Sequence, residues 1–185
     1  MNNLDELLRI YNRNYAGPED WNLSDYRNHV KSIEQLVVDA DLGIGPRVNR
    51  DKHQFRIPKK VLEEMAKNIS DPTIIEEIKK CKCFDDIFTV IYELRIPNFG
   101  PLAVYDTALR IGAIFGYYPK VIYLHQGALE GAINLIGKEK IETYAAHFLE
   151  NLDYPYISSD ILPNPVSDME PYHIENFLCI NKDKF

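Results

Sequence analysis

The chain lacks the features that mark membrane and secreted proteins. Its 185 residues contain three cysteines and no apolar run of the roughly 18 residues that a bilayer-spanning helix requires. The longest apolar stretch, residues 111–124, is interrupted by Gly112, Gly116 and Pro119. Residues 4–8 do not have the basic and then apolar profile of a signal peptide. We therefore expect a cytoplasmic protein with no membrane contact.

Cysteine is scarce and unsuitably spaced for a metal site. Cys81 and Cys83 flank a single lysine, and Cys179 stands alone in an apolar stretch. No second cysteine pair and no histidine cluster completes a zinc site at the usual spacing. The three cysteines are interpreted as reduced, mostly buried thiols, and neither a metal nor a cofactor is expected.

Motifs of common enzyme classes are also absent. The chain has no Walker phosphate-binding loop, no His-Glu-x-x-His zinc motif and no Gly-x-Ser-x-Gly elbow. The sequence therefore gives no support for a phosphoryl-transfer enzyme, a zinc-dependent hydrolase or a serine hydrolase. The sequence reveals no reaction, and it favours a protein that is not an enzyme.

The net charge of −7 disfavours a generic nucleic-acid binder, because an acidic surface repels the phosphate backbone. The charge is uneven, however. Residues 47–60 hold six basic residues and one acidic residue, so this basic segment carries +5 and the rest of the chain −12. A solvated loop and a phosphate-binding segment both fit this pattern. The residues that would contact phosphates are Arg47, Arg50, Lys52, His53 and Arg56.

Apolar residues make up 45% of the chain and recur at helical spacing along most of it. The pattern predicts helices near residues 4–11, 24–42, 58–69, 72–78, 85–94, 102–115, 128–135, 139–149 and 168–180. We expect a loop at residues 16–18, and Ser24 with Asp25 as the cap of the second helix. Residues 121–124 have strand-like composition, but without an evident partner strand we expect an extended connector there.

These elements predict an all-α fold, a multi-helix orthogonal bundle of roughly eight to nine helices. We expect one domain, with N-terminal helices in residues 1–46, the basic loop in 47–60 and a hairpin-containing bundle in 61–185. A chain of this length can bury a core without disulfides or metals.

The most specific local feature is the connection between two predicted helices at residues 96–101. Pro97 cannot continue a helix, and Asn98 is the residue that, after glycine, best tolerates positive φ. Gly100 permits positive φ as well and leaves the backbone bare, while Phe99 is expected to pack between the two helices. Amides at such a helix N-terminus can bind an anion such as phosphate. Asn98, Phe99 and Gly100 are therefore candidate binding residues.

This connection resembles the helix-hairpin-helix DNA-binding motif, whose pattern is apolar-Pro-Gly-apolar-Gly followed by a helix rich in small residues. The resemblance covers residues 85–115 and extends into 115–125, where the chain looks like the helix-hairpin-helix base-excision DNA glycosylases. Residues 104–127 and 174–185 also resemble a family of bacterial proteins to which no activity is assigned. The first resemblance implies a glycosylase-like scaffold that holds nucleic acid through the hairpin and the basic segment.

The catalytic features of those glycosylases are missing. The resemblance implies that the nucleophilic lysine of some members would stand at Leu102, and that Tyr123 is the nearest counterpart of the catalytic aspartate. No acid lies between Asp106 and Glu130, and the four-cysteine iron–sulfur loop of some members is absent. Base excision needs a carboxylate that stabilises the developing sugar cation or activates the nucleophile. We therefore expect the scaffold without the glycosylase chemistry.

Two other functions remain open from the sequence. A divergent enzyme could use Asp106, which is four residues from Arg110 on one predicted helix face, together with His125 after an apolar run. The structural alternatives are an ion pair for Asp106 and a core or capping role for His125. The acidic surface could instead meet a protein partner or a second copy of the chain.

Overall fold

The computed structural model describes residues 3–28, 31–43 and 57–185. Of these residues, 73% are helical and 4% are in strands, which confirms the all-α prediction. None of the described helices is both long and apolar enough to cross a bilayer. The chain forms two compact units, unit 1 with Met1–Pro18 and Pro119–Phe185, and unit 2 with Glu19–Tyr118. The expected boundaries at residues 46 and 60 stay predictions.

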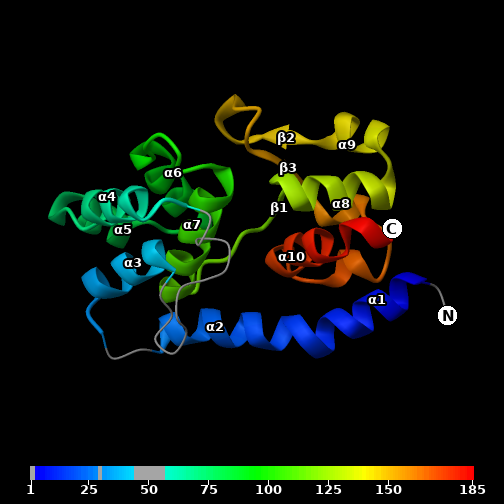
Figure 1. The fold of residues 1–185 in the computed structure, drawn as a ribbon, viewed down its shortest axis with the longest axis horizontal. Helices are drawn as coiled ribbons and strands as arrows, with labels where there is room; N and C mark the ends of the chain where they lie inside the picture. Colours follow the sequence, from blue (N-terminus) through cyan, green and yellow to red (C-terminus); the bar gives the residue numbers. More distant parts are fainter. Residues whose placement is uncertain (1–2, 29–30, 44–56) are drawn as a thin grey trace. The chain divides into compact units, whose positions relative to one another are not determined.

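Unit 2 is built from helices whose starts follow local sequence signals. Asp71 accepts a hydrogen bond from the Thr73 N–H at 2.8 Å and caps the helix that begins at Pro72. The helix after the hairpin begins with Pro101 at its first position, where the missing N–H of proline costs no helical hydrogen bond. Besides α2, which it shares with unit 1, the helices of unit 2 are α3 (Ile33–Leu42), α4 (Lys59–Ile69), α5 (Pro72–Lys80), α6 (Phe84–Leu94) and α7 (Pro101–Phe115) (Figure 1). The helix α7 packs against α6 and α3, and α3 also packs against α4.

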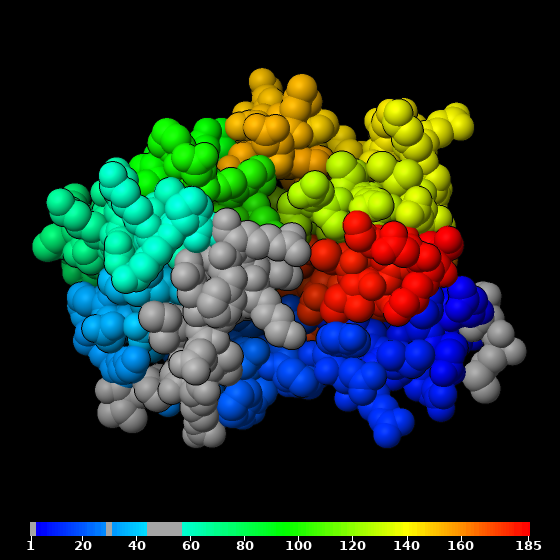
Figure 2. Space-filling model, viewed as in Figure 1, coloured from blue at the N-terminus to red at the C-terminus, as the bar shows by residue number. Residues whose placement is uncertain are grey.

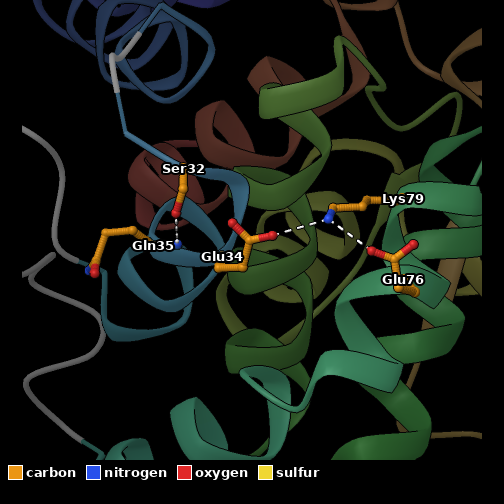
Figure 3. A network of polar contacts seen from close by, with 5 residues as sticks. All are labelled: Ser32, Glu34, Gln35, Glu76 and Lys79. Carbon is orange, nitrogen blue, oxygen red and sulfur yellow. Dashed lines mark hydrogen bonds and ion pairs between the residues drawn. The ribbon is translucent and has the colours of Figure 1, made fainter.

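The helix α3 begins after Ser32, not near Ser24 as expected. The Ser32 hydroxyl oxygen accepts a hydrogen bond from the Gln35 N–H at 3.3 Å (Figure 3). The Ser24 hydroxyl donates instead to the Trp21 carbonyl at 2.8 Å, inside α2. Ser24 is therefore a residue within a helix, and the cap prediction is wrong.

An ion-pair network joins α3 to α5. The Lys79 ammonium donates to the Glu34 carboxylate at 3.0 Å and to the Glu76 carboxylate at 2.9 Å (Figure 3). The bonds to Glu76 and then to Glu34 raise the pKa of Lys79. Because the two carboxylate side chains are 54% and 61% exposed, water screens the network and its contribution to stability is small.

Unit 1 combines helices with a small antiparallel sheet. Its α-helices are α1 (Asn3–Tyr11), α8 (Gln126–Ile136), α9 (Lys138–Tyr144) and α10 (Pro171–Asn181). Its strands are β1 (Ile122–Tyr123), β2 (Ala146–His147) and β3 (Pro155–Ile157), and β3 lies between the other two. Short 3-10 turns occupy Phe148–Glu150, Ser159–Ile161, Val166–Asp168 and Lys182–Lys184. The core forms where α10 packs against α8, β1 and α1.

The prediction of an unpaired connector at residues 121–124 is wrong. The strand β1 pairs with β3 in antiparallel orientation, and the Leu124 N–H donates to the Pro155 carbonyl at 2.8 Å. The partner strand β3 spans Pro155–Ile157, in a proline-rich stretch of the chain. Pro155 is the first residue of β3, a position where a strand tolerates the missing N–H of proline.

The loop expected at residues 16–18 is absent as well. A π-helical turn, η1 (Asn12–Ala16), joins α1 to α2 (Gly17–Arg27), so the described backbone stays helical from residue 3 to residue 27. Pro18 lacks an N–H and disturbs the regular α-helical bonding pattern. The wider π-helical turn directly before Pro18 accommodates this disturbance.

Gly112 of α7 lies too close to the following backbone to accept a side chain. A Cβ at Gly112 would overlap the main-chain carbonyl oxygen of Tyr117, whose N–H donates to the Gly112 carbonyl at 2.8 Å. We predict that Gly112→Ala lowers the free energy of unfolding by about 1–3 kcal/mol, measured by urea denaturation. Gly100→Ala is the control, because a Cβ at Gly100 meets no atom within 4 Å. Equal losses in both variants would contradict this close approach.

Candidate functional site

The connection between α6 and α7, residues 95–100, is called the hairpin turn below. The Phe99 N–H donates to the Ile96 carbonyl at 3.0 Å, and Asn98 has a φ of 71°. Proline at the second position and a left-handed residue at the third define a type II β-turn. The positive φ at Asn98 agrees with the tolerance expected of asparagine there.

The hairpin turn is open to solvent. Pro97, Asn98 and Gly100 are exposed, whereas the Phe99 side chain is buried at 3% exposure. Phe99 therefore anchors the turn, and the backbone on either side of it stays accessible. The Val104 N–H donates to the Gly100 carbonyl at 3.1 Å and closes the first turn of α7. Because Pro101 has no N–H, the amides of α7 without an acceptor inside the helix are those of Leu102, which is half-buried, and Ala103, which is buried.

Gly100 does not adopt the positive φ that it permits. Its φ of −77° and ψ of 178° are extended angles that other residues adopt without strain. Since a Cβ there meets no atom within 4 Å, the fold does not require glycine at this position. What glycine provides is the absence of a side chain beside the first amides of α7.

Arg95 is the cation of the hairpin turn, and it was not predicted as a site residue. Its guanidinium carbon lies 3.6 Å from the centroid of the Tyr92 ring, and the guanidinium donates to the Tyr92 carbonyl. These two contacts hold an exposed positive charge at the start of the turn. Glu93, two residues earlier, is also exposed, and its negative charge reduces the net charge near Arg95. The binding of an anion at the turn would therefore depend on the backbone amides as well as on Arg95. The sequence signal was an arginine three residues after a tyrosine at the end of a predicted helix.

The basic segment falls largely outside the described residues. Arg47, Arg50, Lys52, His53 and Arg56 all lie outside them. Their proximity to the hairpin turn therefore stays a prediction. Lys59, at the end of the segment, is described and pairs with Glu63 of α4 at 3.1 Å.

Asp106 and Arg110 form the predicted ion pair on α7. The carboxylate and guanidinium are 3.7 Å apart, and the two side chains are 13% and 8% exposed. The Arg110 guanidinium also donates to the Ala40 carbonyl of α3 at 3.3 Å. This geometry fits a structural ion pair for Asp106 and not a catalytic role, because its partner Arg110 also bonds to the last turn of α3 and so connects α7 to α3.

A second buried acid, Asp41, was not predicted from the sequence. It is fully buried in the last turn of α3, where burial raises its pKa to about 7 and the charge of Arg110 partly opposes this rise. Asp41, Asp106 and Arg110 are together called the polar cluster. The signal in the sequence was an acid four residues after Val37, on the apolar face of an amphipathic helix.

His125 lies in unit 1, whereas Asp106 lies in unit 2. His125 precedes α8, and its Nε2 lies 3.2 Å from the Glu175 carboxylate of α10, with both side chains at most 10% exposed. This contact joins α8 to α10 within the core of unit 1. The use of Asp106 and His125 together by an enzyme stays a prediction.

The cysteines show no arrangement for redox or metal chemistry in the described part of the chain. Burial raises the pKa of the Cys81 thiol to about 11, so the thiol is protonated at neutral pH. Within residues 3–28, 31–43 and 57–185, no three His, Cys, Asp or Glu side chains are grouped as metal ligands.

The three most exposed large apolar side chains of the described residues lie on or shortly before the loop at residues 148–153, called the β2–β3 loop. Tyr144, Leu149 and Leu152 are 58%, 59% and 78% exposed. The loop belongs to the orange segment at the upper edge of Figure 2. Leu149 and Glu150 have φ values of 46° and 59°, so two successive non-glycine residues are left-handed.

Comparisons of the chain with models of protein families, with curated proteins and with solved structures found no match. The resemblance to the helix-hairpin-helix glycosylases therefore stays a prediction carried by residues 85–125.

The backbone angles of Asn98 predict how the turn responds to substitution. Asn98→Ala should lower the free energy of unfolding by about 1 kcal/mol, because alanine tolerates a φ of 71° less well than asparagine. Asn98→Gly should keep or slightly raise it, since glycine adopts this φ without strain. Urea denaturation of both variants tests the turn. A more stable alanine variant would contradict the type II geometry.

Proposed function

We propose that this protein binds the phosphate backbone of a nucleic acid through the hairpin turn. The observation that carries the proposal is the coincidence of three features at one exposed turn. These are the amides of Leu102 and Ala103 in the first turn of α7, the bare backbone at Gly100 and the guanidinium of Arg95. A cytoplasmic location, as expected from the sequence, would give the turn access to nucleic acid.

A helix N-terminus suits an acidic protein that binds phosphate. The aligned peptide dipoles place about half a positive charge at the start of a helix such as α7, whatever the net charge of the chain. Backbone N–H groups then bind phosphate oxygens without requiring an extensive basic surface. The basic segment would add side-chain cations to the same ligand. Affinity in the range of non-specific binders, a Kd of roughly 1–100 μM, is expected at physiological salt.

The proposal includes binding but no base excision. Leu102, at the position that the resemblance assigns to the nucleophilic lysine, is the second residue of α7 and carries no nucleophile. Tyr123, the nearest counterpart of the catalytic aspartate, is a buried residue of β1. Without a carboxylate at that position, the chemistry of the family has no support in this chain.

We predict that Arg95→Glu and Gly100→Ala each weaken DNA binding about threefold or more, measured by fluorescence anisotropy at low salt. Arg95→Glu replaces the cation of the turn with an acid, and Gly100→Ala places a methyl group beside the amides without disturbing the fold. If the basic segment contacts the same ligand, binding by the unaltered chain should also fall steeply between about 50 and 200 mM salt.

Two matched variants control this experiment. Arg13→Glu makes the same charge change at an exposed residue of η1, and Gly17→Ala adds a methyl group where no atom lies within 4 Å of it. Both controls should bind DNA with affinities closer to that of the unaltered chain than the affinities of Arg95→Glu and Gly100→Ala are. If all four variants bind alike, or if the unaltered chain binds no DNA at low salt, the proposed function fails.

A different observation favours a second candidate function, the binding of a protein partner through the β2–β3 loop. Left-handed backbone at a non-glycine residue costs about 1–3 kcal/mol, and this loop contains two such residues. Hydrogen bonds from the Phe148 N–H to the Tyr154 carbonyl at 3.0 Å and from the Asn151 N–H to the Phe148 carbonyl at 2.9 Å hold the loop closed. The strained but well-bonded loop presents Leu149 and Leu152 to solvent, as a contact surface requires.

If the partner is a second copy of the chain, the double variant Leu149→Asp, Leu152→Asp should dissociate it. We expect self-association of the unaltered chain below about 500 μM in sedimentation equilibrium, and at least tenfold weaker association of the double variant. Ile10→Asp, at a residue that is 38% exposed on α1, is the control for added negative charge. An unaltered chain that stays monomeric over this range would exclude a second copy as the partner.

A further inference from the structure

The Arg95 side chain lies flat against Tyr92 at the end of α6. Its guanidinium carbon is 3.6 Å from the centroid of the Tyr92 ring. A guanidinium this close stacks nearly parallel to the ring, because a perpendicular plane would push a nitrogen into the π face. Its Nη1 group also donates to the Tyr92 carbonyl, in the last turn of α6, where a cation is favourable. These two contacts fix the plane of the guanidinium.

The opposite face of this guanidinium is open. Arg95 is exposed, whereas Tyr92 is half-buried. Among the described residues, only Tyr92 bonds to the guanidinium or stacks on it. Since Tyr92 covers one face and binds one amino group, the exposed area of Arg95 lies on the second face and on the Nε and Nη2 edge. That face and edge are available to a ligand.

A planar cation with an open face and an open edge fits two parts of a nucleotide. Its edge binds phosphate oxygens, and its face stacks on a base. Phosphates are accessible in single strands and in duplexes alike. In a duplex, however, each base is stacked between its neighbours and presents only its edge in the grooves. A side chain that offers a stacking face therefore distinguishes single strands from duplexes.

The charge of the chain also favours the single strand. Duplex DNA carries one negative charge per about 1.7 Å of its axis, and each strand contributes half of this charge. The net charge of the chain is −7, and the exposed Glu93 lies two residues before Arg95. A ligand with fewer charges per length is therefore repelled less. Stacking of one base strengthens binding about fivefold or more and requires no further cation.

We propose that the hairpin turn selects single-stranded nucleic acid, with an unpaired base stacked on the open face of the Arg95 guanidinium. Tyr92 supports the other face and keeps the plane in position. The type II β-turn brings residues 96 and 99 within about 7 Å of each other, so a short stretch of the strand reaches both Arg95 and the Leu102 amide. The inference rests on the proposed function, because it names the kind of nucleic acid that this turn binds.

Fluorescence anisotropy at low salt tests the inference with labelled ligands of about 16 nucleotides. They are a DNA single strand, its duplex, and a single strand of the same length whose sugars carry no bases. The unaltered chain should bind the first about fivefold more tightly than the other two. The abasic strand keeps every phosphate, so the difference reports the bases. The corresponding RNA strand identifies the preferred sugar, and its binding should depend on Arg95 in the same way.

Arg95→Lys separates stacking from charge, because lysine keeps the cation and lacks the planar face. This variant should bind the DNA and RNA single strands about fivefold more weakly, and the duplex and the abasic strand within about twofold of the unaltered chain. Arg13→Lys makes the same exchange at an exposed arginine of η1 and should leave all four affinities unchanged.

The outcomes separate this inference from the proposed function. If the unaltered chain binds none of the four ligands, the proposed function fails and the inference fails with it. If Arg95→Glu weakens binding while the single strand and the duplex bind alike, the proposed function stands and the inference is overturned. The inference is also overturned if Arg95→Lys binds the single strands like the unaltered chain, or if it loses affinity for the abasic strand by the same factor.

Discussion

The buried guanidinium of Arg110 is the constraint on which the organisation of unit 2 depends. An arginine cannot lose its proton inside a protein, so its charge must be met wherever the side chain is buried. In unit 2 the Ala40 carbonyl at the end of α3 and the Asp106 carboxylate one turn earlier on α7 are among its partners. These partners fix where α3 ends relative to α7. The apolar side chains around them then pack in one arrangement.

The helix α7 joins two features that act separately. The exposed hairpin turn ends at Gly100, and the cluster residues Asp106 and Arg110 lie six and ten residues further along, which corresponds to roughly 9 and 15 Å of helix. Between Gly100 and Asp106, the residues Ala103, Val104 and Tyr105 are buried, and Pro101 and Leu102 are half-buried. At this separation the charge of the cluster contributes little to the potential at the solvated turn. An anion at the turn would therefore interact mainly with the local amides and with Arg95.

Local sequence patterns predicted most of the helices. They did not predict the pairing of β1 with β3 or the burial of the acidic residue Asp41. Some residues restrict the backbone at their own position, so their effect could be predicted without knowing the fold. These are Pro72 and Pro101, which start helices, and Asn98, which adopts a positive φ in the turn. Ser32 also had a local signal, because Gln35 follows it at capping-box spacing, and Ser24 was chosen wrongly. The pairing of β1 with β3 joins segments distant in sequence, and the pKa of Asp41 depends on its burial. Neither can be obtained from a local pattern.

The net charge of the chain and the proposed ligand have the same sign, and this makes the source of any affinity measurable. Counterions are released from a nucleic acid when cationic side chains neutralise its phosphates, so the slope of affinity against salt counts those cations. Amides at a helix N-terminus attract phosphate without adding a full charge, and they contribute to affinity more than to this slope. A turn that acts mainly through amides therefore gives a shallow slope, and one that acts with the basic segment gives a steep one. The salt dependence thus separates the contribution of the hairpin turn from that of the basic residues between 47 and 60.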